Sequence, residues 1–112
     1  MEKVFIIIAD ADPRILTDVV FPYARNAIRN KWMEEIVLIL WGPIQRTVVG
    51  ALELKSQVMD LVETEQISVW ASKQCSDDYN VSDKLRELGV TVQFIGEKVS
   101  TMLKEGWYQL SF

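Results

Sequence analysis

Val4-Phe-Ile-Ile-Ile-Ala9 is the stretch that decides the fold. A continuous run of apolar, mostly β-branched residues is typical of a strand that is buried on both faces of a sheet. Two further runs, Glu35 to Trp41 and Ile67 to Ala71, have the same character. Between the runs, apolar residues recur at helical spacing over about 13–30 and 53–65. This alternation predicts a parallel sheet covered by helices.

The carboxyl-terminal third continues the alternation. Ser82 suits the cap of a short helix, which Gly89 would end. A strand over 90–95, a short helix over 98–104 and a final strand over 107–112 are expected to follow. The expected fold class is α/β, a three-layer αβα sandwich with a mainly parallel five-stranded sheet. Its order is βαβαβαβαβ, with right-handed crossovers.

Composition indicates one ordinary globular domain over residues 1–112, long enough for a single core and too short for two. A formal charge of -4 argues against binding to nucleic acid or anionic lipid, because both polyanions would be repelled. The longest apolar runs are far shorter than the roughly 20 residues that cross a bilayer. The amino terminus also lacks a signal-peptide pattern. We therefore expect a cytoplasmic protein with no nucleic-acid or membrane partner.

The chain contains no histidine and a single cysteine, Cys75. The lack of imidazole excludes Ser-His-Asp and Cys-His nucleophile activation and histidine-ligated zinc. No convergent set of carboxylates is evident, so no metal or cofactor is predicted. Cys75 follows the predicted strand 67–71, at the edge where open parallel sheets carry ligands and reactive groups. A free cysteine is also a common core residue, and the inert role stays open.

Charged neighbours act on the Cys75 thiol in opposite directions. Lys73, together with backbone amides if a helix opens here, favours the thiolate, which is the nucleophilic form. Asp77 and Asp78 oppose it by like-charge repulsion. The sequence leaves the sign of the balance open. Lys73 and Arg46 are also candidates for contact with an anion.

Further candidate binding residues follow the first two strands. Asp10 comes directly after the first strand, and Trp41 and Gly42 end the second. Because the carboxyl ends of parallel strands meet at one edge, these residues are expected on the same rim as Cys75. Trp41-Gly42-Pro43 either walls a pocket there or forms a plain turn. No glycine-rich phosphate-binding loop occurs.

Asp10 and Asp12 resemble the magnesium-binding acidic pocket of response-regulator receivers. A receiver also needs a phosphate-accepting aspartate at the end of a later central strand. The second and third strands end instead in Trp41-Gly42 and Ala71-Ser72. Asp12 is better explained as the cap of a helix that begins with Pro13, which suits a first helical position. A magnesium-dependent receiver is therefore the least favoured functional hypothesis, behind the two that are given below.

Tryptophan is abundant for so small a domain. Large aromatic side chains are enriched at oligomer interfaces, and they also fill cores. The sequence does not decide between these roles for the four tryptophans, Trp32, Trp41, Trp70 and Trp107.

The carboxyl-terminal half resembles the DsrE/DsrF-like family of small sulfur-relay proteins. The resemblance rests on Ala71-Ser-Lys-Gln-Cys75-Ser-Asp-Asp-Tyr79, Leu85-Arg-Glu-Leu-Gly-Val90, Gly96-Glu97 and Leu103-Lys-Glu-Gly-Trp-Tyr-Gln-Leu110. It implies a homotrimer or homohexamer with the cysteine near a subunit interface. It also implies that Cys75 accepts a sulfur atom as a persulfide from a donor protein and passes it to an acceptor protein. The acidic loop at 10–13 and the pair Asp77-Asp78 depart from the family pattern.

The leading hypothesis is therefore a sulfane-sulfur (persulfide) carrier or sulfurtransferase subunit that acts through Cys75. The alternative is a non-catalytic oligomeric binding module that holds a small molecule or a partner protein on the rim formed by Asp10, Trp41, Gly42 and Cys75. Lys73 is a further candidate binding residue there. The sequence identifies neither the sulfur donor nor the acceptor.

Overall fold

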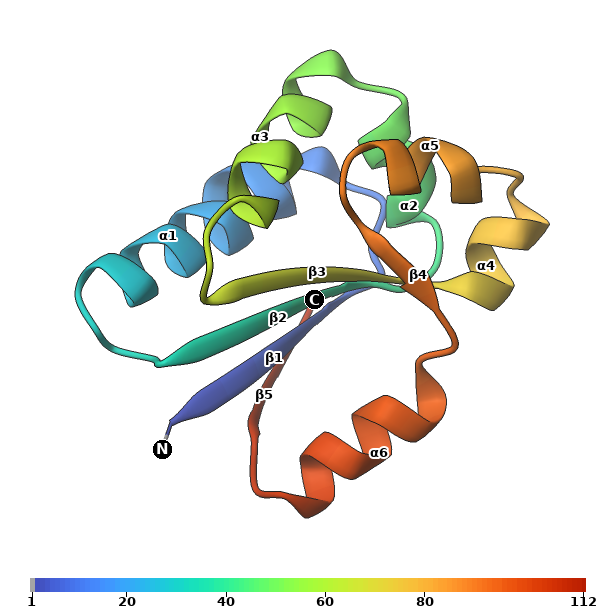
Figure 1. Cartoon of the computed structure of the whole chain (residues 1–112). Helices are drawn as coiled ribbons and strands as arrows, with labels where there is room; N and C mark the ends of the chain where they lie inside the picture. Colours follow the sequence, from blue (N-terminus) through green and yellow to red (C-terminus); the bar gives the residue numbers. More distant parts are fainter. Residues whose placement is uncertain (1) are drawn as a thin grey trace.

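Five strands form one parallel sheet in the computed structural model, which describes residues 2–112 (Figure 1). The sheet order is β4-β3-β2-β1-β5, and every neighbouring pair is parallel. The three apolar runs of the sequence are its three central strands, as predicted. The strands are β1 (Lys3–Ile8), β2 (Glu35–Leu40), β3 (Ile67–Ser72), β4 (Thr91–Gln93) and β5 (Tyr108–Ser111).

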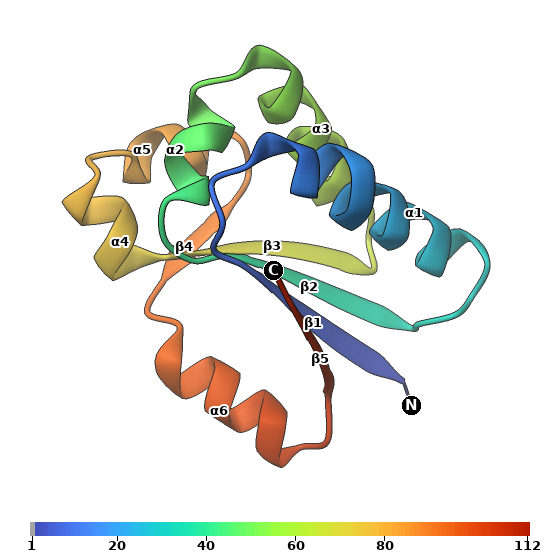
Figure 2. The same ribbon diagram turned by 180° about the vertical axis from the view of Figure 1, so that it is seen from behind.

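The helices lie on both faces of the sheet, but unequally (Figures 1 and 2). The steps from β1 to β4 all run in one direction across the sheet, and right-handed crossovers then place their helices on one face. The step from β4 to β5 runs back to the opposite edge, so its helix covers the other face. The three-layer sandwich is thus confirmed. The helices are η1 (Ile15–Val20, a π-helix), α1 (Phe21–Arg29), α2 (Ile44–Val49), α3 (Leu52–Val62), α4 (Lys73–Asp78), α5 (Ser82–Glu87) and α6 (Gly96–Lys104).

The apolar core has two parts, one on each face of the sheet. The larger part lies under η1, α1, α2, α3 and α5, and it takes alternate residues of β1, namely Val4, Ile6 and Ile8. The smaller part lies under α6 and contains Phe5 of β1 together with Met102. Three tryptophans are half-buried against this smaller part: Trp41, Trp70 and Trp107.

The fourth tryptophan, Trp32, is 53% exposed, and its ring centroid lies 6.4 Å from that of Tyr23. Three of the four tryptophans therefore contact the core, and the interface role stays a prediction. No helix among residues 2–112 is long and apolar enough to span a membrane.

Two expected helix signals are confirmed. The backbone N–H of Arg14 donates to Asp12 Oδ1 at 2.9 Å, and helical residues begin at Pro13, as predicted for a cap followed by a first-position proline. Gly89 ends α5 with φ of +89°, and its N–H donates to the Arg86 carbonyl at 2.9 Å. This is the left-handed conformation that glycine adopts most readily after a helix.

Other boundaries were predicted wrongly. Helix α2 precedes α3 as a separate element, because Gly50 divides the apolar stretch where one helix from 53 was expected. Helix α4 was not foreseen. Strand β4 covers three residues instead of 90–95, and Phe94 beyond it is 65% exposed. Val81, not Ser82, holds the cap position of α5, and the Ser82 hydroxyl bonds elsewhere.

Candidate functional site

The loops after β1, β2 and β3 meet at one edge of the sheet, called here the carboxyl rim. The N–H of Trp41 donates to the Ile8 carbonyl at 3.0 Å, which joins the ends of β2 and β1. The Thr47 hydroxyl donates to the Ala11 carbonyl at 2.7 Å, which ties α2 to the loop after β1. All the candidate residues follow these three strands, as expected for a parallel sheet: Asp10, Trp41, Gly42, Lys73 and Cys75.

Trp41 and Gly42 direct the chain at this edge. Gly42 has φ of +102°, a conformation that side-chain-bearing residues rarely adopt, and the chain turns there into α2. The Trp41 side chain packs against the smaller core on the α6 face, whereas α2 lies on the opposite face. The turn therefore places an indole and the start of α2 on different sides of the sheet.

Gln45 is a rim residue that sequence reasoning missed. Its side chain is fully buried, and its Nε2 donates to the carbonyls of Leu40 at 2.9 Å and Ser72 at 3.2 Å. Those carbonyls belong to the last residues of β2 and β3, so one amide clamps the two strand ends together. No motif marks Gln45 in the sequence, because it is a single polar residue in a helix that was not predicted.

Cys75 is half-buried and is the third residue of α4, directly beyond the end of β3. The helix turns its next residue, Ser76, inward, where the Ser76 hydroxyl lies 2.6 Å from that of Ser82. This buried contact joins α4 to α5. Cys75 thus lies on a fixed helical turn, partly open to solvent.

Two of the three charged residues beside Cys75, Lys73 and Asp77, neutralise each other. Lys73 Nζ lies 2.6 Å from Asp77 Oδ2, and the Ser82 hydroxyl donates to Asp77 Oδ1 at 2.6 Å. The hydrogen bond from Lys73, followed by that from Ser82, lowers the pKa of Asp77 below its ordinary value of 3.8. Lys73, which was expected to favour the thiolate, is therefore paired with Asp77, which was expected to disfavour it.

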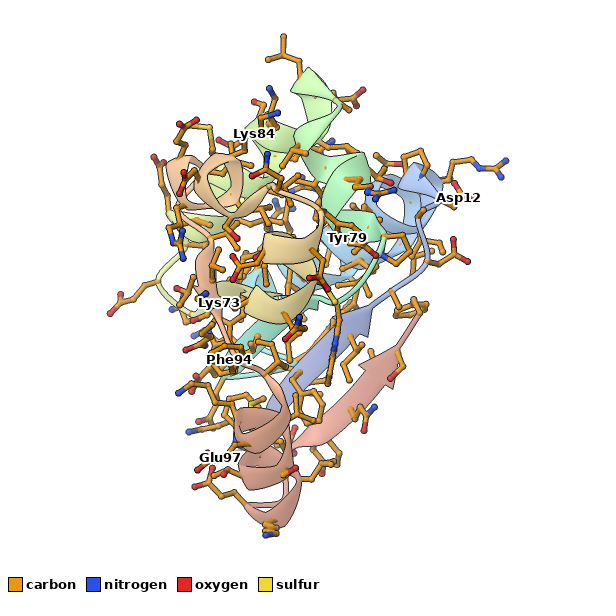
Figure 3. The ribbon with its side chains drawn as sticks, turned by 90° about the vertical axis from the view of Figure 1, so that its right-hand side faces the viewer. Asp12, Lys73, Tyr79, Lys84, Phe94 and Glu97 are labelled. Carbon is orange, nitrogen blue, oxygen red and sulfur yellow. The ribbon has the colours of Figure 1, made fainter. Side chains whose placement is uncertain are left out.

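Two aromatic rings frame α4 (Figure 3). Lys73 Nζ lies 5.4 Å from the centroid of the Phe94 ring, at the end facing β4. The Arg46 guanidinium lies 4.2 Å from the centroid of the Tyr79 ring, which links α2 to the end of α4. Arg46, a candidate for anion contact, thus combines an exposed cation with a cation–π contact that positions it.

The two aspartates after β1 are occupied by local contacts. Asp10 Oδ1 accepts a hydrogen bond from the N–H of Asp12 at 2.9 Å. The Asp12 carboxylate pairs with Arg14 at 2.8 Å, and hydrogen bonds from Arg14 lower its pKa to about 2. Within residues 2–112, no group of three His, Cys, Asp or Glu side chains could hold a metal ion. Asp12 thus caps a helix and pairs with Arg14.

Solved structures with the same fold include two that match nearly the whole chain. A conserved protein of unknown function from Bacteroides thetaiotaomicron, BT1422, matches with a TM-score of 0.93 and 23% identity, over 99% of this chain and 95% of that one. The fold is thus shared. A protein of unknown function from Methanobacterium thermoautotrophicum, MTH1491, matches with a TM-score of 0.76 and 18% identity, over 99% and 98% of the two chains. No protein-family model and no curated protein matches this chain.

Proposed function

We propose that this protein is a sulfane-sulfur carrier, or the sulfur-carrying subunit of a sulfurtransferase, and that Cys75 holds the sulfur as a persulfide. The observation that supports the proposal most directly is the position of the thiol. Cys75 is half-buried on the helical turn that follows β3, on the rim where folds of this kind carry reactive groups. The sequence resemblance to sulfur-relay proteins centres on the same segment.

The transfer needs only the thiol itself. The Cys75 thiolate attacks the terminal sulfur of a donor persulfide, R–S–SH, and forms a new S–S bond while the donor S–S bond breaks. The donor leaves as R–S⁻, and Cys75 becomes Cys–S–SH. An acceptor thiolate then attacks the terminal sulfur in the same way and restores the Cys75 thiolate. Neither step involves a net oxidation or reduction, so no external oxidant or reductant is required.

The charges around α4 are compatible with this exchange. Asp77 would repel an approaching anionic donor if its charge were unopposed. Its carboxylate instead bonds to Lys73 and to Ser82, which leaves Asp78 as the uncompensated carboxylate beside the thiol. The Gln74 amide lies 3.3 Å from an oxygen of Asp78 on the outer side of the same helix. One unpaired carboxylate repels an anionic donor less than the two that the sequence shows, Asp77 and Asp78.

The test is the intact mass of the protein after incubation with glutathione persulfide. We expect the wild type to gain the mass of one sulfur atom and Cys75→Ser to gain none. An excess of a small thiol should then remove the added sulfur and return the original mass. An unchanged wild type, or equal gains in the two proteins, would contradict the proposal.

Assembly and location complete the proposal. On the resemblance to sulfur-relay proteins, we expect a homotrimer or homohexamer in the cytoplasm, where a reduced thiol persists. The alternative is a non-catalytic oligomeric binding module that holds its ligand on the carboxyl rim. In that case Cys75→Ser would leave both assembly and ligand binding unchanged, whereas a carrier loses sulfur transfer. Size-exclusion chromatography with light scattering measures the assembly.

A further inference from the structure

Strand β5 is an edge strand without protection. Within residues 2–112 it pairs with β1 alone, and all four of its residues are exposed. Natural edge strands avoid association through charges, proline, bulges or shortness. The segment Tyr108-Gln-Leu-Ser-Phe112 contains neither a charged residue nor a proline. The opposite edge strand, β4, is three residues long, whereas the four residues of β5 are continued by the ladder hydrogen bonds of Phe112.

The apolar side chains of this segment lie on one face. Tyr108 and Leu110 pair in register with Val4 and Ile6, which point into the larger core. Phe112 continues the ladder, because its N–H donates to the Ile7 carbonyl at 2.8 Å and its carbonyl accepts from Ala9 at 2.8 Å. The helices leave this margin open: the exposed fractions are 56% for Tyr108, 40% for Leu110 and 40% for Phe112.

Polar side chains and free backbone groups belong to the alternate residues. Gln109 and Ser111 lie on the α6 face, where the Gln109 amide donates to the Ser111 hydroxyl at 2.7 Å. Both backbone groups of Phe112 point toward β1. Because successive residues of a strand alternate, the N–H and C=O groups of Gln109 and Ser111 point toward the open edge.

We propose that the β5 strands of two copies of this chain pair antiparallel about a two-fold axis at Leu110. Leu110 then faces Leu110 of the partner subunit, and Tyr108 faces Phe112 of the partner subunit. Gln109 faces Ser111 of the partner subunit, and each such pair exchanges both of its main-chain hydrogen bonds. Every apolar side chain of the strand meets an apolar one, and every polar side chain meets a polar one.

The register is what favours a second copy over a foreign strand. A shift by one residue would place apolar side chains opposite polar ones on each face. A shift by two, with Gln109 on the axis, would leave Phe112 without a facing apolar residue. The self-complementary arrangement therefore exists for one register only. It generates a continuous ten-stranded sheet from the two five-stranded ones. It requires an even number of subunits, so of the two assemblies expected above it is compatible with the homohexamer and excludes the homotrimer.

The first experiment places a positive charge on the axis. Leu110→Lys sets two like charges directly opposite one another and removes the central apolar contact, so the dissociation constant of the dimer should rise at least about tenfold. Leu52→Lys is the matched control, because Leu52 is 80% exposed at the start of α3, which packs over β3, and β2 and β1 separate β3 from β5. Sedimentation velocity over a concentration series measures both, with urea unfolding as a check that each variant folds.

Charge reversal tests the axis itself. An equimolar mixture of the Leu110→Lys and Leu110→Glu variants should form a dimer again, because opposite charges then face each other. A wild type that is monomeric at every concentration would overturn the proposal. So would an odd-numbered assembly that Leu110→Lys leaves intact.

A cysteine scan gives an independent readout of the register. In the Cys75→Ser background, Leu110→Cys should form a disulfide-linked dimer under mild oxidation, because facing residues in an antiparallel pair lie within disulfide range. Gln109→Cys faces Ser111 of the partner subunit and should link far less. Equal linking of the two variants would overturn the register. This experiment does not depend on persulfide chemistry, so either proposal can fail while the other stands.

Discussion

Replacement of Gln45 by methionine tests the clamp between the ends of β2 and β3. Methionine keeps the length of the buried side chain but removes the amide that donates to the carbonyls of Leu40 and Ser72. Each buried acceptor left without its donor costs about 1–3 kcal/mol. Gln45 Oε1 is itself buried without a hydrogen-bond partner among residues 2–112. Its removal should therefore stabilise the fold by about 1–3 kcal/mol, which offsets part of that loss. We expect Gln45→Met to lose about 2 kcal/mol of unfolding free energy.

The assay is equilibrium unfolding in urea at 25 °C, followed by tryptophan fluorescence. Gln66→Met is the control, because Gln66 is exposed in the loop before β3, and surface substitutions usually stay within about 0.5 kcal/mol. Gln45→Glu should cost more than Gln45→Met at neutral pH, since a carboxylate would face two carbonyl oxygens. Equal midpoints for Gln45→Met and Gln66→Met would refute the idea that this amide holds the rim.

Two predictions concern other positions. Gly89→Ala should lower the free energy of unfolding more than Gly106→Ala does. The two φ values are alike, +89° and +87°, but a Cβ at Gly89 would lie 2.7 Å from Val62 Cγ1, whereas a Cβ at Gly106 would have no heavy atom within 4 Å. The left-handed conformation destabilises either alanine variant by about 1–2 kcal/mol, and overpacking against Val62 destabilises Gly89→Ala by about 1–3 kcal/mol more. Urea unfolding measures both variants, and equal losses of unfolding free energy would mean that Val62 moves aside. Asp77, whose pKa is lowered by Lys73 and then Ser82, should stabilise the fold above its ordinary pKa of 3.8 and lose that contribution as the pH falls through the folded value. The difference in urea midpoint between wild type and Asp77→Asn should therefore shrink below pH 3.8, and a pH-independent difference would contradict the ion pair.

Strands with a continuous apolar run were predictable because burial on both faces demands that composition. This applies to β1, β2 and β3, and it decided the fold class. Strand β4 was predicted too long. Phe94 continues the apolar run in sequence but lies exposed beyond the strand, and Ile95 already holds the cap position of α6. Hydrophobicity alone does not show where a strand turns into a helix.

Helix α4 could not be predicted because it has no apolar face. Its one fully buried residue is Ser76, which is satisfied by a hydroxyl from α5. The periodicity that reveals a helix is absent in such a segment. Ser82 was expected to cap α5 by its residue type, but its hydroxyl bonds to Asp77 instead. Contacts between helices decided both outcomes.

The order of the strands was enough to predict which residues lie on the carboxyl rim. It was not enough to predict how their charges pair. Asp10, Gly42 and Cys75 all follow strand ends, which a parallel topology places at one edge. The partners of Lys73 and Asp77 depend on side-chain positions that the sequence left undecided between opposing effects. Gln45 was missed because a single polar residue on an apolar helix face carries no motif.

The connection from β4 through α6 to β5 crosses the whole sheet, and this has a consequence for the order of folding. Strand β5 pairs with β1, at the other end of the sequence, so its placement closes the longest loop in the chain. The segment from α6 onward is the part of the sheet whose contacts are least local. If it detaches as a unit, Phe5 and the rest of the smaller core become exposed to solvent together. Hydrogen exchange should then show the amides of α6 and β5 opening in concert, while those of β2 and β3 remain protected.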